Sequence, residues 1–338
     1  MEKVRFGVVG TNFITDWVIA GGREDERFEA VAVCSRTEER ARAFAARHHI
    51  RHTFTSLDEM AASPLIDAVY IASPNALHAR QSIACMRQGK HVLCEKAFAS
   101  NAAEVRAMIE AARKHGVTLM EAMKPTLTPG FRAVREAVGR IGTVRQYFAC
   151  YCQYSSRYDR LKEGTVLNAF NPELSNGAVM DIGIYTLYPM AVLFGRPKTV
   201  QVSGTKLCSG VDGHGNVSFT YGGGLCATVL YSKIADSQLP TEIQGEEGLV
   251  SLDRINLIGR ATLKHRNGAT EDIMPPTAHN EYYYEIAEFI DLILSGRKES
   301  RINSLENSLI TVEIMDEIRR RLDVRFPADG EQSRVTGF

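Results

Sequence analysis

An acidic and a basic residue, Glu95 and Lys96, stand next to each other after a short apolar segment, 91–94. An apolar run at 67–73 and a helix-period run at 77–88 precede them, which is typical of a strand, helix, strand unit. In an open α/β sheet, ligands bind at the carboxyl ends of the strands. The pair is therefore a candidate for acid–base chemistry, although an isolated Glu-Lys pair at a strand end is more often an exposed surface pair.

A second candidate lies in the apolar segment 177–194, which we expect to be helical. Asp181 and Tyr185 are four residues apart in it, about one helical turn, so their side chains project from the same face. The alternative is that Tyr185 only packs in the core beside Tyr188 and Phe194.

A strand, a tight turn and a helix open the chain. This is the context of a dinucleotide-binding turn, in which the pyrophosphate sits against helix N-terminal amides. Only Gly10 fits the first glycine of G-x-G-x-x-G, and Asn12 and Thr15 take the second and third positions. Asparagine tolerates left-handed backbone better than most residues, which makes Asn12 a sensible substitute. The expected cofactor contacts here are Gly10, Thr11, Asn12, Phe13 and Ile14.

The second expected strand, 29–34, ends at Ser35 and Arg36, with Arg40 one turn further on. Sites that prefer NAD usually place an acidic residue here for the ribose hydroxyl, whereas arginine pairs with a 2′-phosphate. No acid occurs before Glu38, so these three residues favour NADP(H), with NAD(H) possible. The alternative is that Arg36 lies on the surface or stacks on the adenine without selecting the phosphate.

The segment from Ser73 to Lys96 resembles a known signature. Its matching residues are Ser73-Pro74-Asn75, His78, Gly89-Lys90-His91-Val92 and Glu95-Lys96. The signature is that of the glucose-fructose oxidoreductase, inositol dehydrogenase and MocA-like (GFO/IDH/MocA) family, whose strand ends Glu-Lys-Pro. The resemblance implies that Lys96 lies beside the nicotinamide and the substrate. It also implies that the cofactor is bound by Ser73, Pro74, Asn75, His78, Glu95 and Lys96. Here Ala97 replaces the proline, so we expect a trans Lys96–Ala97 peptide.

Asp181, Gly183 and Tyr185 resemble the second signature of the family, which usually has histidine at the last position. The residue sequence of this motif resembles that of the branch of the dimeric dihydrodiol dehydrogenases and NADP-linked D-xylose dehydrogenases, in which tyrosine transfers the proton. The resemblance implies that Tyr185 exchanges a proton with the substrate oxygen. Lys96 would hydrogen-bond that oxygen and lower the tyrosine pKa, and Asp181 would orient the substrate or the lysine.

The order of expected elements predicts two domains. Strands and helices alternate through residue 123, which indicates an α/β Rossmann domain, 1–123, with a parallel sheet. From residue 144 on, long alternating stretches indicate an α+β domain, 124–338, with a large, mostly antiparallel open sheet. The final helix could pack back on the first domain. The resemblance implies a homo-oligomer, dimer or tetramer, through this sheet; the alternative is a sheet covered by its own helices.

Composition excludes several other classes. The 338 residues carry 40 basic and 40 acidic side chains with no basic stripe, so nucleic acid is an unexpected partner. We expect no membrane span, no signal peptide and a cytoplasmic location. Seven cysteines without C-x-x-C spacing indicate neither a disulfide framework nor a metal site.

Together these patterns predict an NAD(P)-dependent oxidoreductase. It would move a hydride between the nicotinamide and a hydroxyl-bearing carbon of a small carbohydrate-like molecule: a sugar, polyol or diol. Two alternatives remain, since some relatives are dinucleotide-binding sensors without turnover and others use NAD to hydrolyse glycosides. The family's arginine and His-Pro after residue 123 are missing here, where 124–129 reads Lys-Pro-Thr-Leu-Thr-Pro.

Overall fold

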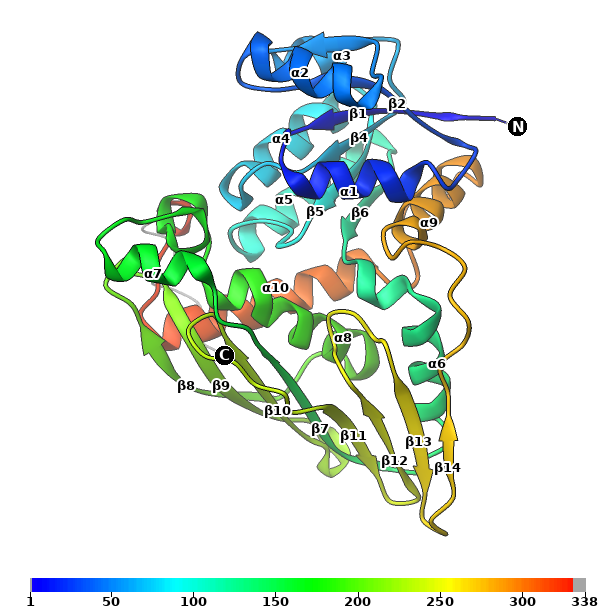
Figure 1. Cartoon of the computed structure of the whole chain (residues 1–338), viewed down its shortest axis with the longest axis vertical. Coiled ribbons are helices and arrows are strands. Elements are labelled where there is room, and N and C mark those ends of the chain that lie inside the picture. The colour runs from blue at the N-terminus through cyan, green and yellow to red at the C-terminus, as the bar shows by residue number, and fades with distance from the viewer. Residues whose placement is uncertain (1, 331–338) are drawn as a thin grey trace. The chain divides into compact units, whose positions relative to one another are not determined.

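The computed structural model describes residues 2–330 and divides into two compact units (Figure 1). Of the described residues, the first comprises 2–127 together with Ala278–Leu309. The second comprises Thr128–Thr277 and 310–330. The expected second domain, 124–338, is one continuous stretch, whereas in this division a segment of about thirty residues, Ala278–Leu309, belongs to the first unit.

The first unit is built on a six-stranded sheet in the order β3-β2-β1-β4-β5-β6, in which every pair is parallel. Strands buried on both faces read as continuous apolar runs, as β4 and β5 do. The strands are β1 (Val4–Val9), β2 (Phe28–Cys34), β3 (His52–Phe54), β4 (Ala68–Ile71), β5 (His91–Glu95) and β6 (Leu119–Ala122). The connecting helices are α1 (Phe13–Gly22), α2 (Glu38–His48), α3 (Leu57–Ala62), α4 (Asn75–Arg87) and α5 (Ala102–His115).

Helix α9 (Tyr283–Leu294) explains why the chain returns to this unit. Its residues Ile286, Phe289 and Ile290 are fully buried in the same core cluster as Phe6 of β1. The Phe6 and Phe289 ring centroids are 6.0 Å apart. The helix therefore completes the core of the parallel sheet.

The second unit contains an eight-stranded sheet in the order β14-β13-β12-β11-β7-β10-β9-β8. Neighbours are antiparallel except β7 and β10, so the expected mostly antiparallel sheet is confirmed. The strands are β7 (Val144–Cys152), β8 (Thr199–Lys206), β9 (Asp212–Thr220), β10 (Cys226–Ser232), β11 (Thr241–Gly245), β12 (Gly248–Leu252), β13 (Ala261–His265) and β14 (Thr270–Asp272).

Several helices belong to the same unit as this sheet, and helix α8 carries Tyr185 of the second candidate site. Helix α8 (Ile184–Phe194) packs on the sheet, where the Tyr147 hydroxyl of β7 donates to the Thr186 carbonyl at 2.9 Å. A π-helical turn, Val179–Gly183, leads into α8. The other helices are α6 (Pro129–Val138) and α7 (Ser156–Lys162), while α10 (Leu305–Arg321) begins in the first unit and continues into the second.

One helical segment, Pro172–Phe194, is long and apolar enough to cross a membrane by length and composition, which the sequence reading did not anticipate. Of its most apolar stretch, 72% is buried inside the protein. This burial is what a core helix requires, since a membrane-spanning helix would present its apolar surface to lipid.

Candidate active site

The turn after β1 has the backbone that a dinucleotide site needs. Gly10 has φ +101°, and a Cβ added there would lie 2.7 Å from the Ala72 carbonyl oxygen, so only glycine fits. Asn12 is extended, with φ −94°, and caps helix α1. Its Oδ1 accepts from the Ile14 and Thr15 amides at 3.0 and 3.3 Å, and its Nδ2 donates to the Ala72 carbonyl at 2.8 Å.

This geometry changes the reason for Asn12 at the second glycine position. The sequence suggested tolerance of left-handed backbone, but the residue does not adopt it. Its side chain instead caps the helix and ties the first turn to the end of β4. Phe13, the first residue of α1, is half exposed.

The end of β2 lies next to this turn. The Thr11 and Ser35 hydroxyls are 3.5 Å apart, and the Gly10 amide donates to the Cys34 carbonyl at 3.2 Å. Arg36 and Arg40 are exposed. Within residues 2–330, Arg36 forms no ion pair, so its guanidinium is available to an anionic ligand.

His78 joins the loops that follow β4 and β5. Its ring is fully buried, with Nδ1 2.9 Å from the Ala97 carbonyl and Nε2 2.8 Å from the Ser73 carbonyl. Burial lowers the pKa of His78 below its usual range, and the two carbonyls oppose this change because each favours an N–H on the ring nitrogen that faces it. The side chain therefore holds two loops together, and Ser73 is fixed again by its 2.6 Å hydrogen bond to Gln81 Oε1. Pro74 and Asn75 begin helix α4.

The Lys96–Ala97 peptide is cis, so the expected trans peptide is wrong. That expectation rested on the local preference of a bond without proline. In the folded chain, Ala97 is buried and its carbonyl contacts His78, so tertiary surroundings decide the conformation.

Glu95 is tied into the interior of the unit. Its carboxylate accepts from the Tyr70 hydroxyl at 2.7 Å and from the Lys96 amide at 3.2 Å. Burial raises the pKa of Glu95 above its usual range, although the Tyr70 hydrogen bond opposes the change. Burial likewise raises the pKa of Glu121, on β6, to about 8. The Glu-Lys pair is therefore more than two exposed charges at a strand end.

Asp181 and Tyr185 are both half-buried, and the three residues between them are buried. This pattern places the two side chains at one accessible face, even though Asp181 lies in the π-helical turn and Tyr185 in α8. Irregular π turns occur frequently at functional sites. The Tyr185 ring packs edge-on against Tyr151 of β7, with centroids 5.7 Å apart.

The sequence reading missed Lys233, which follows β10. Its ammonium forms an ion pair with the Asp181 carboxylate, and its side chain is only 6% exposed. The sequence offered one signal for this residue: Lys233 is the one charged side chain in the expected strand 225–234.

Two residues of the segment 124–129, which lacks the family pattern, have side-chain partners in the first unit. Lys124 pairs with Glu281 and lies 4.3 Å from the centroid of the Tyr282 ring. The buried Thr126 hydroxyl contacts Asn303 Oδ1 at 2.6 Å. This part of the chain therefore anchors the segment that returns to the parallel sheet.

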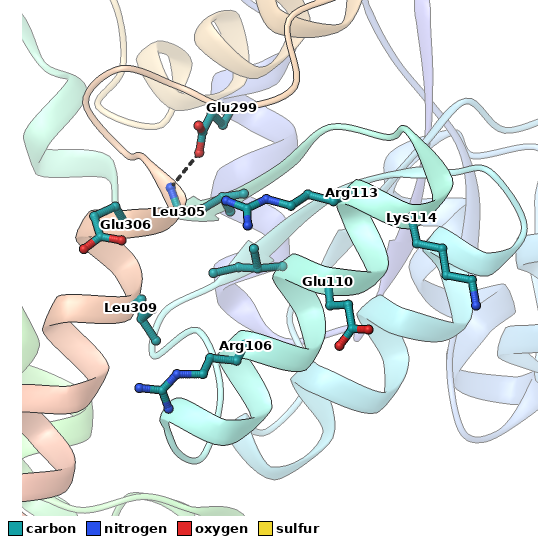
Figure 2. Close-up of a pocket in the computed structure, with 9 residues that line it drawn as sticks. Arg106, Glu110, Arg113, Lys114, Glu299, Leu305, Glu306 and Leu309 are labelled. Atoms are coloured by element: carbon teal, nitrogen blue, oxygen red, sulfur yellow. Dashed lines mark hydrogen bonds between the residues drawn. The ribbon is translucent and has the colours of Figure 1, made fainter.

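A pocket of about 700 Å³ lies elsewhere in the first unit, between α5 and the start of α10 (Figure 2). None of the predicted site residues lines it. Basic residues of α5 face it together with acidic residues of the α10 region, and the Glu299 carboxylate accepts from the Leu305 amide at 3.3 Å. That carboxylate already caps the start of α10.

Comparisons with known proteins agree with this geometry. Residues 4–123 match the model of an oxidoreductase family with an NAD-binding Rossmann fold, and residues 131–251 match the GFO/IDH/MocA C-terminal domain. The chain is 50% identical over 326 residues to the scyllo-inositol 2-dehydrogenase (NADP(+)) IolU of Bacillus subtilis, covering 96% of this chain and 99% of that protein. It is 27% identical over 338 residues to the mouse trans-1,2-dihydrobenzene-1,2-diol dehydrogenase, covering 96% and 99%.

Solved structures share the fold. The aldose-aldose oxidoreductase of Caulobacter crescentus has a TM-score of 0.83 at 23% identity, over 95% of this chain and 98% of that one. The two family models and relatives that cover 96% of the chain confirm the family resemblance. The chain belongs to the GFO/IDH/MocA family and is an NAD(P)-dependent oxidoreductase.

Proposed function

We propose that the chain is an NADP(H)-preferring dehydrogenase of a small ring polyol or vicinal diol. The observation that carries this proposal is the accessible face of the second unit, where Asp181 and Tyr185 lie with a buried lysine paired to the carboxylate. A carboxylate accepts from a substrate hydroxyl, and a phenol one turn away can exchange a proton with another. The relatives named for scyllo-inositol and for dihydrobenzene diol act on rings with vicinal hydroxyls, which supports the same substrate class.

Each residue has a defined task in this proposal. Tyr185 takes the proton from the reacting hydroxyl. Lys96, directly after β5, belongs to the cofactor-binding unit and would lie at the nicotinamide end of the dinucleotide. Asp181 accepts from a neighbouring hydroxyl and orients the ring. The bound nicotinamide supplies hydride transfer.

The first unit fits a dinucleotide at its β1 turn. The close approach of Gly10 to Ala72 leaves no room for a Cβ, and helix α1 begins directly after the turn. Gly10, Thr11, Phe13 and Ile14 would hold the pyrophosphate, and Ser35, Arg36 and Arg40 the ribose end. The absence of an acid at 35–37 and the NADP(+) in the name of the 50% identical relative support a preference for NADP(H).

We further propose a cytoplasmic homo-oligomer that associates through the eight-stranded sheet. All seven cysteines are free in the structure, and unpaired thiols are typical of reducing compartments. The sheet presents half-buried apolar side chains such as Phe148 on the face opposite α8.

The direct test of the activity is a panel of inositols, aldoses, open-chain polyols and trans-diols, each with NADP⁺ or NAD⁺, followed by the absorbance of the reduced nicotinamide. We expect turnover with one or more ring polyols and a higher kcat/KM with NADP⁺. Tight NADP(H) binding without turnover on any member would contradict the proposal and favour a sensor. Cleavage of a glycoside without net change in the cofactor would favour a hydrolase.

A further inference from the structure

Lys233 is a buried cation in the immediate surroundings of the candidate site. Lysine is almost never fully buried unless it is paired. Its side chain is 6% exposed, and its ammonium contacts the Asp181 carboxylate, which is 26% exposed. The ammonium also lies 5.9 Å from the centroid of the buried Phe170 ring, an apolar wall that offers no competing acceptor.

The backbone at Lys233 is fixed on one side by the sheet and on the other by the residue that caps α7. Its amide donates to the Gly213 carbonyl of β9 at 2.9 Å, and its carbonyl accepts from the Ser155 amide at 2.9 Å. The Ser232 hydroxyl accepts from the Ile234 and Ala235 amides at 3.1 and 3.0 Å, so the following turn is closed as well. The backbone that carries the ammonium lies just beyond β10 and is held by hydrogen bonds on both sides.

The acidic partner lies on an irregular element. Asp181 belongs to the π-helical turn, and the turn packs against β7, β9 and β10. A carboxylate on a short side chain can take several orientations, and a fixed cation beside it selects one.

We propose that Lys233 is a positioning residue for the reaction: it holds the Asp181 carboxylate in one orientation, so that the carboxylate accepts from a substrate hydroxyl beside Tyr185. This inference rests on the proposed dehydrogenase function, because it assigns Lys233 a task in that site. Lys233 acts through Asp181 and does not itself transfer a proton.

A double-mutant cycle tests the assignment on the full-length protein with the best substrate of the panel. We expect Lys233→Met to lower kcat/KM by about tenfold to a hundredfold, the range of a hydrogen bond to a charged group. KM for NADP⁺ should change little, because Lys233 is not among the residues proposed to bind the cofactor. Lys233→Met should add almost nothing in the Asp181→Asn background, since its only route to the chemistry is then gone. Lys233→Arg should restore part of the loss.

Lys206→Met is the matched control. Lys206 also pairs with an aspartate of the second unit, Asp323, but both side chains are exposed, at 40% and 70%. We expect its kcat/KM to equal that of the unaltered protein. Circular dichroism shows whether Lys233→Met folds. If it does not, two other variants are compared with the unaltered protein: the double variant Asp181→Asn with Lys233→Met, in which both partners are neutral, and the single variant Lys233→Arg.

The outcomes separate the two proposals. If the unaltered protein turns over no member of the panel, the proposed function is wrong. If it turns over a polyol but Lys233→Met keeps normal kcat/KM, or loses as much in the Asp181→Asn background as alone, the positioning role of Lys233 is wrong and the dehydrogenase proposal stands.

Discussion

Tyr185 differs from its neighbour Tyr188 on the same helix, because it is half-buried at an accessible face while Tyr188 is fully buried. We expect Tyr185→Phe to reduce turnover by roughly a hundredfold to ten-thousandfold, the range of general acid–base catalysis, and to leave NADPH affinity unchanged. Steady-state kinetics and fluorescence titration of NADPH measure the two effects. Tyr188→Phe is the control and should keep near-normal turnover. Normal turnover of Tyr185→Phe would make this tyrosine a packing residue.

Arg36 carries the expected cofactor preference, since it is exposed at the end of β2 and no acidic residue accompanies it at 35–37. We expect Arg36→Ala to weaken NADP(H) binding by about tenfold to a hundredfold, because a charge-assisted hydrogen bond to the 2′-phosphate is lost. NAD(H) binding should change little. Arg42→Ala, which removes an exposed arginine paired with Glu38 on helix α2, should leave both affinities as they are. An unchanged NADP(H) to NAD(H) affinity ratio in Arg36→Ala would refute the assignment.

Glu121 makes stability depend on pH in a direction opposite to that of an ion-paired acid. Burial raises its folded pKa to about 8, above that of the unfolded chain, so the folded state keeps a proton that the unfolded state loses. The contribution of Glu121 to the free energy of unfolding is therefore fully present below the unfolded pKa, near 4.3. It declines as pH rises toward about 8, by up to about 1.4 kcal/mol per pH unit.

Glu121→Gln cannot ionise, so its free energy of unfolding should fall less steeply than that of the unaltered protein between about pH 5 and 8. Urea unfolding at several pH values measures the slopes. The exposed Glu110, on helix α5, supplies the control variant Glu110→Gln, which should retain the original slope. Identical slopes for Glu121→Gln and the unaltered protein would show that Glu121 is ionised in the folded state.

At the scale of elements, much of the fold follows from periodicity. Continuous apolar runs such as 67–73 predict strands of a parallel sheet, and they form β4 and β5 with Glu95 at the carboxyl end. Features that depend on tertiary partners could not be predicted. The cis Lys96–Ala97 peptide, the π-helical turn at Asp181 and the burial of Lys233 each depend on residues far away in the chain.

Helix α9 is another element whose tertiary partners could not be predicted from its own sequence. Its apolar period predicts a helix, but nothing in 283–294 says which sheet it covers. Because Phe289 is fully buried against Phe6 in the parallel-sheet core, Phe289→Ala should lower the free energy of unfolding by about 3–5 kcal/mol. Leu294→Ala, on the same helix but 37% exposed, should cost about 0.5 kcal/mol or less. Urea unfolding measures both, and equal costs would mean that α9 does not complete this core.

At the scale of the whole molecule, the eight-stranded sheet has one face against α8 and another that carries Phe148, half-buried among the alternate residues of β7. The cross-strand neighbours of Phe148, Thr228 and Glu242, are polar, so a partner chain on this face would cover an apolar centre with a polar rim. We therefore expect light scattering after size exclusion to give a dimer or tetramer of the 37.4 kDa chain. Phe148→Glu should shift the mass to that of one chain, because it places a charge in the buried interface. Lys114→Glu, an exposed change in the first unit, should leave the mass unaltered. A monomeric unaltered protein, or a Phe148→Glu variant that keeps its full mass, would contradict association through this face.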